Sequence, residues 1–248
     1  MDIKELLDKE VALRNSDCEL SYEKPDPLLI ARKYKDEWIS LLCALYAYGN
    51  VRAIIGFLDS LDFSLLDKSE EEIQIKLEGK YYRFQNSMDV INSFITIKRA
   101  KSRYRSLESI FLDGYKKDNN ICEGIYSTIE VFDGLNNYNS DGYRFLFGNR
   151  PKKNSNKGAS PLKRWNMYLR WMVRLDCLDM GLWSGVDKKN LIIPLDTHTF
   201  AVSKKLGLLE RNSYDLESAI LLSDKLREFD RDDPIKYDFA IYRLGQEL

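Results

Sequence analysis

Residues 191–207 read LIIPLDTHTFAVSKKLG, and this stretch is the starting point for the fold. An apolar run that contains Pro194 leads to Asp196, which begins a helical pattern that Gly207 ends. Aspartate is a favoured N-cap residue, because its carboxylate accepts hydrogen bonds from free backbone N–H groups of the first turn. The stretch therefore predicts a helix over residues 197–206. The residues before Asp196 are mostly apolar, so we expect its carboxylate to face a partly buried space.

The segment KGASPLKRWNMYLRW contains a second helix start. Ser160 is a good N-cap and Pro161 suits the first helical position, which predicts a helix over residues 161–174 with Lys163 in its first turn. The helix dipole disfavours a cation there, and Arg164 adds positive potential. Both effects favour the neutral amine, which is the form that attacks an electrophilic carbon. A surface lysine without a catalytic role is the simpler interpretation of this segment taken alone.

Helical periodicity continues through most of the chain. Apolar spacing and cap residues predict further helices over residues 36–60 with an interruption at Gly49-Asn50, and over residues 89–98, 106–116, 122–135 and 215–229, with a last helix from Pro234. Ser69 and Glu72 resemble a capping box that opens a short helix, although the alternating pieces IQIKL and KYYRF could instead form a hairpin.

Residues 136–160 are rich in Asn, Gly, Ser and Lys, which predicts an irregular segment. The predicted fold class is therefore all-α. We expect a single unit over residues 1–248 that divides into two lobes with a cleft, one formed by residues 1–30 and 136–248 and the other by residues 31–135.

Composition excludes several classes of protein. Hydrophobic residues make up 44% of the chain and charged residues 31%, and the longest apolar run, residues 38–48, is too short to span a bilayer. The acidic start MDIKELLDKE is unlike a signal peptide. Four widely spaced cysteines without a CxxC pair, together with a single histidine, argue against a zinc site. We expect a cytoplasmic monomer with no metal, no cofactor and no membrane contact.

Charge is distributed unevenly along the chain. The net charge of −1 argues against a globally basic nucleic-acid-binding protein. One stretch nevertheless contains eight basic residues and no Asp or Glu: Arg150, Lys152, Lys153, Lys157, Lys163, Arg164, Arg170 and Arg174. We interpret it as a phosphate-binding strip, the alternative being a solvated face balanced by acids elsewhere. His198 lies in the first turn of the helix after Asp196, where it could meet a phosphate, although a lone histidine is more often structural.

The sequence IPLDTHT resembles the hydrophobic-Pro-hydrophobic-Asp-x-His motif that ends the catalytic segment of the helix-hairpin-helix–Gly/Pro-Asp DNA glycosylases. In bifunctional members a lysine in the first turn of an earlier helix precedes the aspartate, as Lys163 does here. Lys163 and Asp196 lie 33 positions apart, a spacing similar to that of the archaeal 8-oxoguanine glycosylase branch.

A longer resemblance is to a bacterial domain-of-unknown-function family, DUF2400, from Asp26 onward. It is carried by the blocks DPLLIARKYKDEW, LYAYGNVRAI, YYRF, FLFGNRPKKNSNKGASPLKRWNMYLRWMVR, LIIPLDTHT and REFDRDDPIKYDFAIYRLG. Two features of the glycosylases are missing. GNRPKKNSNKGASP stands where their Leu-Pro-Gly-x-Gly hairpin is expected, and the iron–sulfur cysteines of some branches are absent, so we expect no metal cluster.

The resemblance to the glycosylases implies a two-lobed helical glycosylase fold and a base-excision repair enzyme, a DNA glycosylase with AP lyase activity. Its expected substrate is an oxidised purine, with 8-oxoguanine favoured, flipped out of damaged duplex DNA near the bacterial nucleoid. Lys163 would form a Schiff base, and Asp196 would deprotonate or orient it and stabilise positive charge at C1′. The residues expected to contact the DNA backbone are His198, Lys152, Lys153, Lys157 and Arg164.

Base recognition is expected from the last helix, DPIKYDFAIYRLG. Asp238 interrupts an apolar stripe there, which is often only the solvated edge of a face. Glycosylases of this fold supply a polar reader and an aromatic residue one turn later from their C-terminal helix, and Asp238 and Tyr242 have that spacing. Trp165 is a further candidate for contact with the base.

Two alternatives stay open. The chain could be a non-catalytic nucleic-acid-binding protein with the same fold, or a monofunctional glycosylase for alkylated bases in which Asp196 activates water. Lys163 at a helix start favours the lyase over the monofunctional enzyme, which needs no amine there. The combination of Lys163, Asp196 and His198 with the basic strip disfavours the non-catalytic protein.

Overall fold

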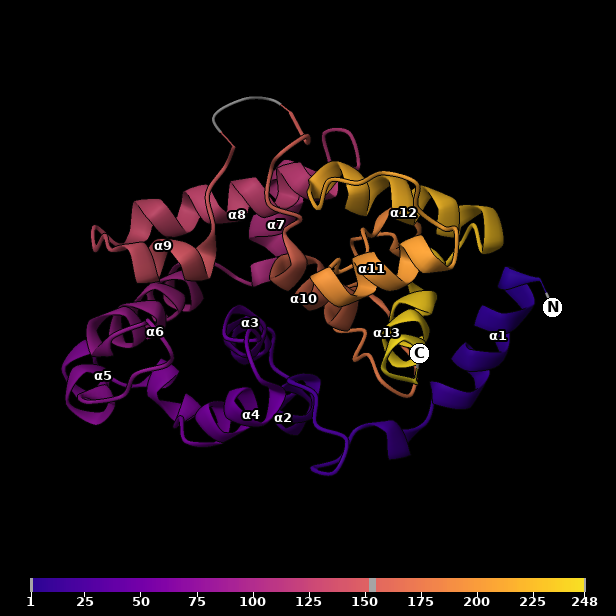
Figure 1. The fold of residues 1–248 in the computed structure, drawn as a ribbon. Helices are drawn as coiled ribbons and strands as arrows, with labels where there is room; N and C mark the ends of the chain where they lie inside the picture. The colour runs from indigo at the N-terminus through magenta and orange to yellow at the C-terminus, as the bar shows by residue number, and fades with distance from the viewer. Residues whose placement is uncertain (1, 152–154, 248) are drawn as a thin grey trace. The chain divides into compact units, whose positions relative to one another are not determined.

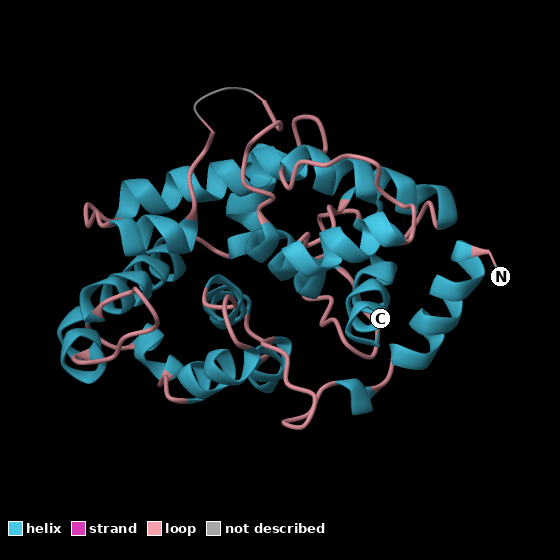
Figure 2. Ribbon diagram, in the orientation of Figure 1, coloured by secondary structure: helices cyan, strands magenta, loops and turns pink. Residues whose placement is uncertain are grey.

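The structure is a computed structural model that describes residues 2–151 and 155–247. Within these two ranges it contains thirteen α-helices and four short 3-10 helices (Figure 1). Helices and loops make up the drawn chain in Figure 2, and the only β-type pairings of the described residues are two isolated bridges. The predicted all-α class is confirmed for the described part of the chain. None of the described helices combines the length and hydropathy that a membrane span requires.

The chain forms two compact units, which we describe separately. Unit 1 consists of Met1–Ser21 and Pro151–Leu248, and unit 2 of Tyr22–Arg150. The unit boundaries differ from those of the predicted lobes, because helix α2 (Leu28–Tyr34) packs with α3 (Glu37–Leu45), and α9 (Asp141–Phe147) packs with α6 (Ser87–Arg103).

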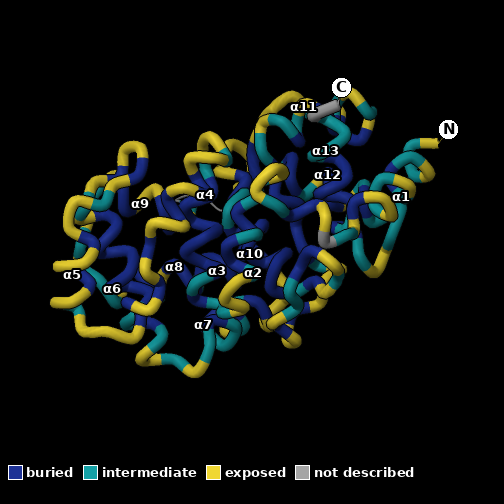
Figure 3. Tube along the Cα trace, turned by 90° about the horizontal axis from the view of Figure 1, so that it is seen from below, coloured by how far each residue is buried: buried dark blue, intermediate teal, exposed yellow. Residues whose placement is uncertain are grey.

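Unit 1 is built around one buried helix and the segments that follow it. Its elements are α1 (Ile3–Arg14), η1 (Asp17–Glu19), α10 (Lys163–Val173), η3 (Lys188–Asn190), α11 (Thr197–Lys205), α12 (Leu216–Phe229), η4 (Pro234–Tyr237) and α13 (Asp238–Glu247). Helix α10 is buried along most of its length (Figure 3), and its fully buried side chains include Tyr168 and Trp171. Helix α13 packs against both α11 and α1.

The contact between α11 and α13 depends on Gly245. A Cβ atom at this position would lie 2.5 Å from Nε2 of His198 and 2.3 Å from Cγ2 of Val202. A side chain at this position would require His198 and Val202 to shift, so glycine allows the two helices to approach with these side chains in place. The start of α11 is thereby held against α13.

Unit 2 is organised around its longest helix, α6. The other elements of unit 2 are α2, α3, α4 (Val51–Asp59), η2 (Phe63–Asp67), α5 (Glu70–Leu77), α7 (Leu107–Tyr115), α8 (Ile121–Leu135) and α9. Helices α3, α5, α8 and α9 all contact α6, whose buried residues include Val90, Phe94 and Ile97. These residues recur every three or four positions, so one apolar face of α6 forms the centre of the unit 2 core.

Side-chain caps explain where most helices of unit 2 begin. The predicted capping box of Ser69 and Glu72 is confirmed, and it opens α5. The predicted helix over residues 36–60 is divided where expected, because Gly49 has a φ of 97° and Asn50 caps α4. The hairpin alternative for residues 73–84 is wrong as a pair of strands, since IQIKL belongs to α5. Helix α9 lies in the segment expected to be irregular, and Ser140 caps it.

Helices α7 and α8 cross closely at Gly114. A Cβ atom at Gly114 would lie 2.3 Å from the backbone oxygen of Glu123, at the start of α8. Backbone cannot swing aside as a flexible side chain can, so this crossing requires glycine. Gly134, near the end of α8, has no neighbour within 4 Å of its Cβ position.

We predict opposite effects for alanine at these two helical glycines. Gly114→Ala should lower the free energy of unfolding by about 1–3 kcal/mol, because α7 and α8 must separate. Gly134→Ala is the matched control and should be neutral or stabilising by up to about 1 kcal/mol, because alanine favours the helix. Urea unfolding followed by circular dichroism measures both. Equal effects of the two substitutions would contradict the close crossing.

Candidate active site

Lys163 is the first residue of α10, and the chain enters this helix in an unexpected way. Leu162 precedes it in the left-handed region, with a φ of 53°. The prediction that Ser160 caps the helix is wrong, because its Oγ meets only the backbone N–H of Leu162, at 3.4 Å. The entry is held instead by Asn166, whose buried side chain donates to the backbone oxygen of Pro161 at 3.1 Å. Lys163 still lies in the first turn, without a side-chain cap beside it.

Asp196 caps α11 as predicted, and only one of its oxygens is used for this. Oδ1 accepts a hydrogen bond from the backbone N–H of Thr199 at 2.7 Å. The apolar run before it, residues 191–195, is buried, and Tyr214 donates to the backbone oxygen of Leu195 at 3.0 Å. These contacts fix the backbone on which the carboxylate is carried.

The second carboxylate oxygen of Asp196 faces the amine. Nζ of Lys163 lies 3.6 Å from Oδ2 of Asp196, and the two side chains are 32% and 24% exposed. The pair therefore joins the first turns of two helices that are separated in sequence. It is open enough for a ligand to reach and covered enough to weaken screening by water.

Asp238 lies in the electrostatic environment of this pair. It is the first residue of α13, is almost fully buried, and accepts a hydrogen bond from Nη1 of Arg170. Burial raises the pKa of the Asp238 carboxyl, and the charge of Arg170 opposes that rise. The charges of Asp196 and Lys163 also act on this pKa, more weakly and in opposite directions. Two carboxylates and one amine thus share one region of unit 1.

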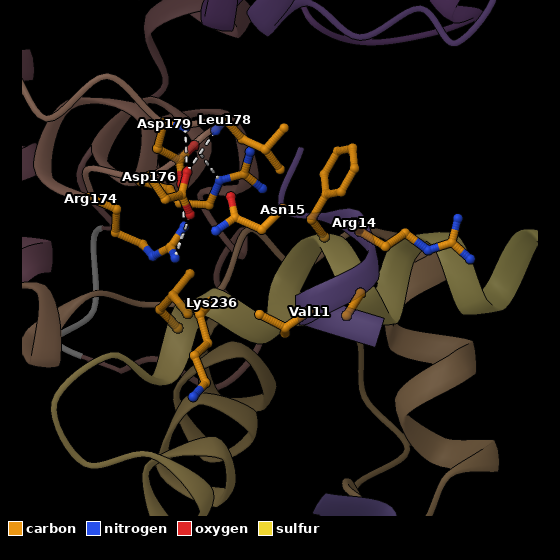
Figure 4. Close-up of a pocket in the computed structure, with 12 residues that line it drawn as sticks. Val11, Arg14, Asn15, Arg174, Asp176, Leu178, Asp179 and Lys236 are labelled. Carbon is orange, nitrogen blue, oxygen red and sulfur yellow. Dashed lines mark hydrogen bonds and ion pairs between the residues drawn. The ribbon is translucent and has the colours of Figure 1, made fainter. Parts of the chain in front are cut away.

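Arg170 and Arg174 form a buried ion network on α10 that sequence analysis missed. Asp179 accepts from Nε of Arg170 at 3.1 Å and also from Nη1 of Arg174. Arg174 donates further to Asp233 at 2.8 Å and to Asp176 at 2.9 Å. Figure 4 shows Arg174, Asp176 and Asp179 meeting at one end of a small pocket, whose lining includes residues of α1. The one signal in the sequence is that Arg170 and Arg174 share a helical face with Lys163.

This network corrects the interpretation of the basic strip. Arg170 and Arg174 are buried among carboxylates, so they are not surface cations for phosphate. Arg150 pairs with Glu123 and Glu130 in unit 2. Lys157 is exposed and Arg164 is half-buried, whereas Lys152 and Lys153 lie outside the described residues.

The remaining predicted site residues pack against their neighbours. Nε2 of His198 lies 3.3 Å from the backbone oxygen of Tyr242, and the two rings meet edge to face at 5.7 Å. Trp165 is buried and packs against Tyr168, with ring centroids 6.3 Å apart. His198 and Tyr242 are thus brought together at the α11–α13 contact, whereas Trp165 belongs to the core around α10. No group of His, Cys, Asp and Glu side chains in the described ranges could hold a metal ion.

The chain matches the sequence model of one protein family along most of its length. The family described as "Protein of unknown function (DUF2400)" matches residues 26–247. The chain belongs to this family. The match spans the Lys163–Asp196 pair, Asp238 and the buried network, so all of them are part of the family region. Comparison with curated proteins and with solved structures finds no match.

The loop that leads to Lys163 is fixed by Asp215, the N-cap of α12. Its Oδ2 accepts from the backbone N–H of Gly158 at 2.9 Å, and its Oδ1 accepts from that of Ser218 at 3.1 Å. Arg211 pairs with the same carboxylate at 2.6 Å. Arg211 and these backbone N–H groups lower the pKa of Asp215 to about 2, against the effect of burial.

We predict that Asp215 stabilises unit 1 only above acidic pH. A carboxyl whose pKa is lower in the folded state contributes its full stability at pH values above its pKa in the unfolded chain, about 3.9. This contribution is lost as the pH falls toward the folded-state pKa, about 2. Asp215→Asn keeps a cap but removes the charge, so it should cost about 1–2 kcal/mol at neutral pH and progressively less below about pH 4. Urea unfolding across this range measures the difference from the wild type. A difference that stays constant as the pH falls would contradict the role of the charge.

Proposed function

We propose that this protein is a base-excision repair DNA glycosylase with associated AP lyase activity. Its substrate would be an oxidised purine in duplex DNA, with 8-oxoguanine favoured. The observation that carries the proposal is the 3.6 Å distance between Nζ of Lys163 and Oδ2 of Asp196, across the starts of α10 and α11. The two-lobed glycosylase-like fold and the cytoplasmic monomer expected from the sequence are part of the same proposal.

The chemistry needs an amine and a carboxylate within reach of one sugar carbon. Asp196 takes a proton from Lys163, and the neutral amine attacks C1′ while the N-glycosidic bond breaks. The base leaves with the electron pair of that bond and takes up the proton from Asp196, which is then a carboxylate again. The carboxylate also stabilises the positive charge that develops at the sugar. Opening of the sugar ring gives a Schiff base, and loss of a C2′ proton then expels the 3′ phosphate.

The division of labour within the Asp196 carboxylate supports this mechanism. Oδ1 is used to cap α11, whereas Oδ2 faces the amine. The hydrogen bond of Oδ1 to the helix start also fixes the position of Oδ2. The Asp196 side chain is therefore already ordered before substrate binds, which lowers the entropic cost of binding. The half-exposed Lys163 can reach substrate from the same point.

Asp238 would read the base in this proposal. An ionised carboxylate only accepts hydrogen bonds, and the Watson–Crick edge of a guanine-type base presents two donors. In the structure this carboxylate is almost fully buried, and burial raises its pKa, while Arg170 occupies part of it and opposes that rise, so reading a base would require a ligand to reach a buried, paired group. Tyr242, one turn later on α13, would stack on the flipped base, and Trp165 remains a proposed contact.

Contacts to the DNA backbone are proposed for five residues, of which the first two lie outside the described ranges. They are Lys152, Lys153, Lys157, Arg164 and His198. The exposure of Lys157 and the partial exposure of Arg164 and His198 fit this role. Phosphate contacts of this kind orient DNA without reading its sequence.

We predict that Lys163 forms a covalent adduct with damaged DNA. Borohydride reduces a Schiff base to a stable bond, so wild-type protein should be trapped on duplexes carrying 8-oxoguanine or an abasic site. Lys163→Gln should abolish trapping and keep DNA affinity within a few fold, because the side chain is polar and partly exposed. Lys205→Gln, an exposed lysine in the last turn of α11, is the matched control and should trap normally.

The outcomes of this experiment separate the candidate functions. Undiminished trapping by Lys163→Gln would refute the assignment of the nucleophile. Base release by the wild type without any adduct would identify a monofunctional glycosylase. Binding without base release or adduct on any lesion would identify a non-catalytic DNA-binding protein.

We predict that the charge of Asp196 determines the rate of base excision, whereas its hydrogen bond to the start of α11 determines stability. Asp196→Asn keeps an acceptor for Thr199 and should leave the midpoint of thermal unfolding nearly unchanged, while single-turnover excision falls by about 100- to 1000-fold. Asp196→Ala loses both roles and should also cost about 1 kcal/mol of stability. An excision rate for Asp196→Asn within a few fold of wild type would mean that the carboxylate is only a cap.

A further inference from the structure

Unit 2 carries a cluster of three aromatic side chains, of which two are exposed and one is half-buried. The rings of Tyr48, Phe84 and Phe145 contact one another in pairs, with centroids 5.8 Å apart for Tyr48–Phe84 and 4.8 Å apart for each of the other two pairs. Phe84 is 55% exposed and Phe145 is 40% exposed. Tyr81, on the same turn as Phe84, is also exposed. We call Tyr48, Phe84 and Phe145 the aromatic cluster.

The turn that contains Phe84 is attached to the core of unit 2 by buried side chains. Tyr82 and Gln85 exchange two backbone hydrogen bonds, of 3.1 and 2.9 Å, around Arg83 and Phe84. Tyr82 is buried, stacks on Phe57 at 4.7 Å, and donates from its hydroxyl to the backbone of Tyr48 at 2.6 Å. Arg83 and Phe84, at the centre of the turn, are exposed, and the buried Tyr82 and Gln85 on either side of them attach the turn to the core.

Gln85 fixes the turn to the other two parts of the cluster. Its buried side chain donates to the backbone oxygen of Gly142 in α9 at 3.1 Å and accepts from the hydroxyl of Tyr48. Helix α9 carries Phe145, so residues from three separate parts of the chain are held in one place. The cluster is therefore a constructed surface and not a set of isolated exposed rings.

This construction opposes stability. Exposed phenylalanine rings forgo the favourable burial of apolar area. Arg83 also has a φ of 55°, in the left-handed region that costs a non-glycine residue about 1 kcal/mol or more. Exposed apolar surface that a fold maintains at such a cost indicates a binding surface.

The charges at the cluster indicate the kind of partner. The guanidinium of Arg83 lies 5.5 Å from the centroid of the Tyr48 ring and packs against Gly49, where a Cβ atom would lie 2.1 Å from its Nη1. Arg52, three residues after Gly49, is exposed in the first turn of α4. Aromatic faces beside guanidinium groups bind nucleic-acid strands, because bases stack on the rings and phosphates pair with the cations.

We propose that the aromatic cluster of unit 2 binds the unpaired bases of a single-stranded nucleic acid by stacking, with Arg83 contacting its phosphates. Each base has an apolar face, so the surface would be tolerant of sequence. The inference extends the proposed function by giving unit 2 a ligand of its own, and its test does not require base excision. Phe84 and Phe145 carry the stacking surface.

A tryptophan reporter tests the contact directly. The four native tryptophans are buried: Trp38, Trp165, Trp171 and Trp183. Phe84→Trp places an exposed indole in the cluster, and its emission should be quenched in a saturable manner by an oligothymidylate of about 12 nucleotides. Ile75→Trp, at an exposed position on α5, is the matched control and should show no saturable quenching. Equal quenching at both positions would overturn the proposal.

Leucine substitutions distinguish stacking from docking of an apolar protein. Phe84→Leu and Phe145→Leu keep apolar area but remove the aromatic face, and each should weaken oligothymidylate binding about tenfold in fluorescence anisotropy. Ile75→Ala should have no effect, and thermal unfolding of each variant verifies its fold. Wild-type affinity of both leucine variants would overturn the proposal. A change in sedimentation of the wild type that these variants abolish, without an effect on oligothymidylate, would identify a self-association surface and also overturn it.

The failure of this inference is separable from that of the proposed function. Oligothymidylate binding involves no covalent step, so in a Lys163→Gln background it should still be weakened about tenfold by Phe84→Leu, a substitution in unit 2. Borohydride trapping that fails while binding depends on Phe84 would leave the stacking surface standing and refute the lyase. Trapping that succeeds while binding ignores Phe84 and Phe145 would do the reverse.

Discussion

The carboxylate of Asp179 lies between the guanidinium groups of Arg170 and Arg174, and it holds unit 1 together around α10. A buried charge that loses its partner costs several kcal/mol, so none of these three groups can move away without the others. Arg174 extends the constraint to Asp233 before η4, and Arg170 extends it to Asp238 at the start of α13. Helix α10 and helix α13 are therefore linked by the ion pair of Arg170 and Asp238.

The ion network at the C-terminal end of α10 also restricts the position of its N-terminal end, which carries Lys163. Arg170 lies seven residues, or about two helical turns, after Lys163, so a fixed guanidinium sets the position of the amine through the rigid helix. On the other side, α13 holds α11 through the close approach at Gly245, and α11 begins at Asp196. The amine and the carboxylate, 3.6 Å apart, are thus carried by two helices that both contact elements of this network. Burial raises the pKa of Asp238, and its pairing with Arg170 opposes that rise.

Local physics made much of this predictable from the sequence. Asp196, Ser69 and the Gly49-Asn50 break act on their own first turns, so short patterns identify them. The entry to α10 was not predictable in this way, because the left-handed Leu162 is held by Asn166 and not by the Ser160-Pro161 pattern. The polar composition of residues 136–160 predicted an irregular segment and missed α9, because a polar segment can still form a capped helix.

Long-range pairing explains what sequence reasoning missed in the candidate site. Arg170 and Arg174 resembled members of a phosphate-binding strip because the stretch without acids ends at Arg174. Asp176 and Asp179 follow it directly and were not considered as partners, whereas Asp233 and Asp238 come from distant parts of the chain. The same limit applied to KYYRF, whose alternation suggested a strand. A strand would place Tyr82 and Phe84 on one face. In the structure they belong to a turn in which Tyr82 is buried and Phe84 is exposed, and Gln85 attaches this turn to α9. In both units a few buried polar contacts between distant segments hold exposed groups in place, and those contacts are invisible to any pattern confined to one segment.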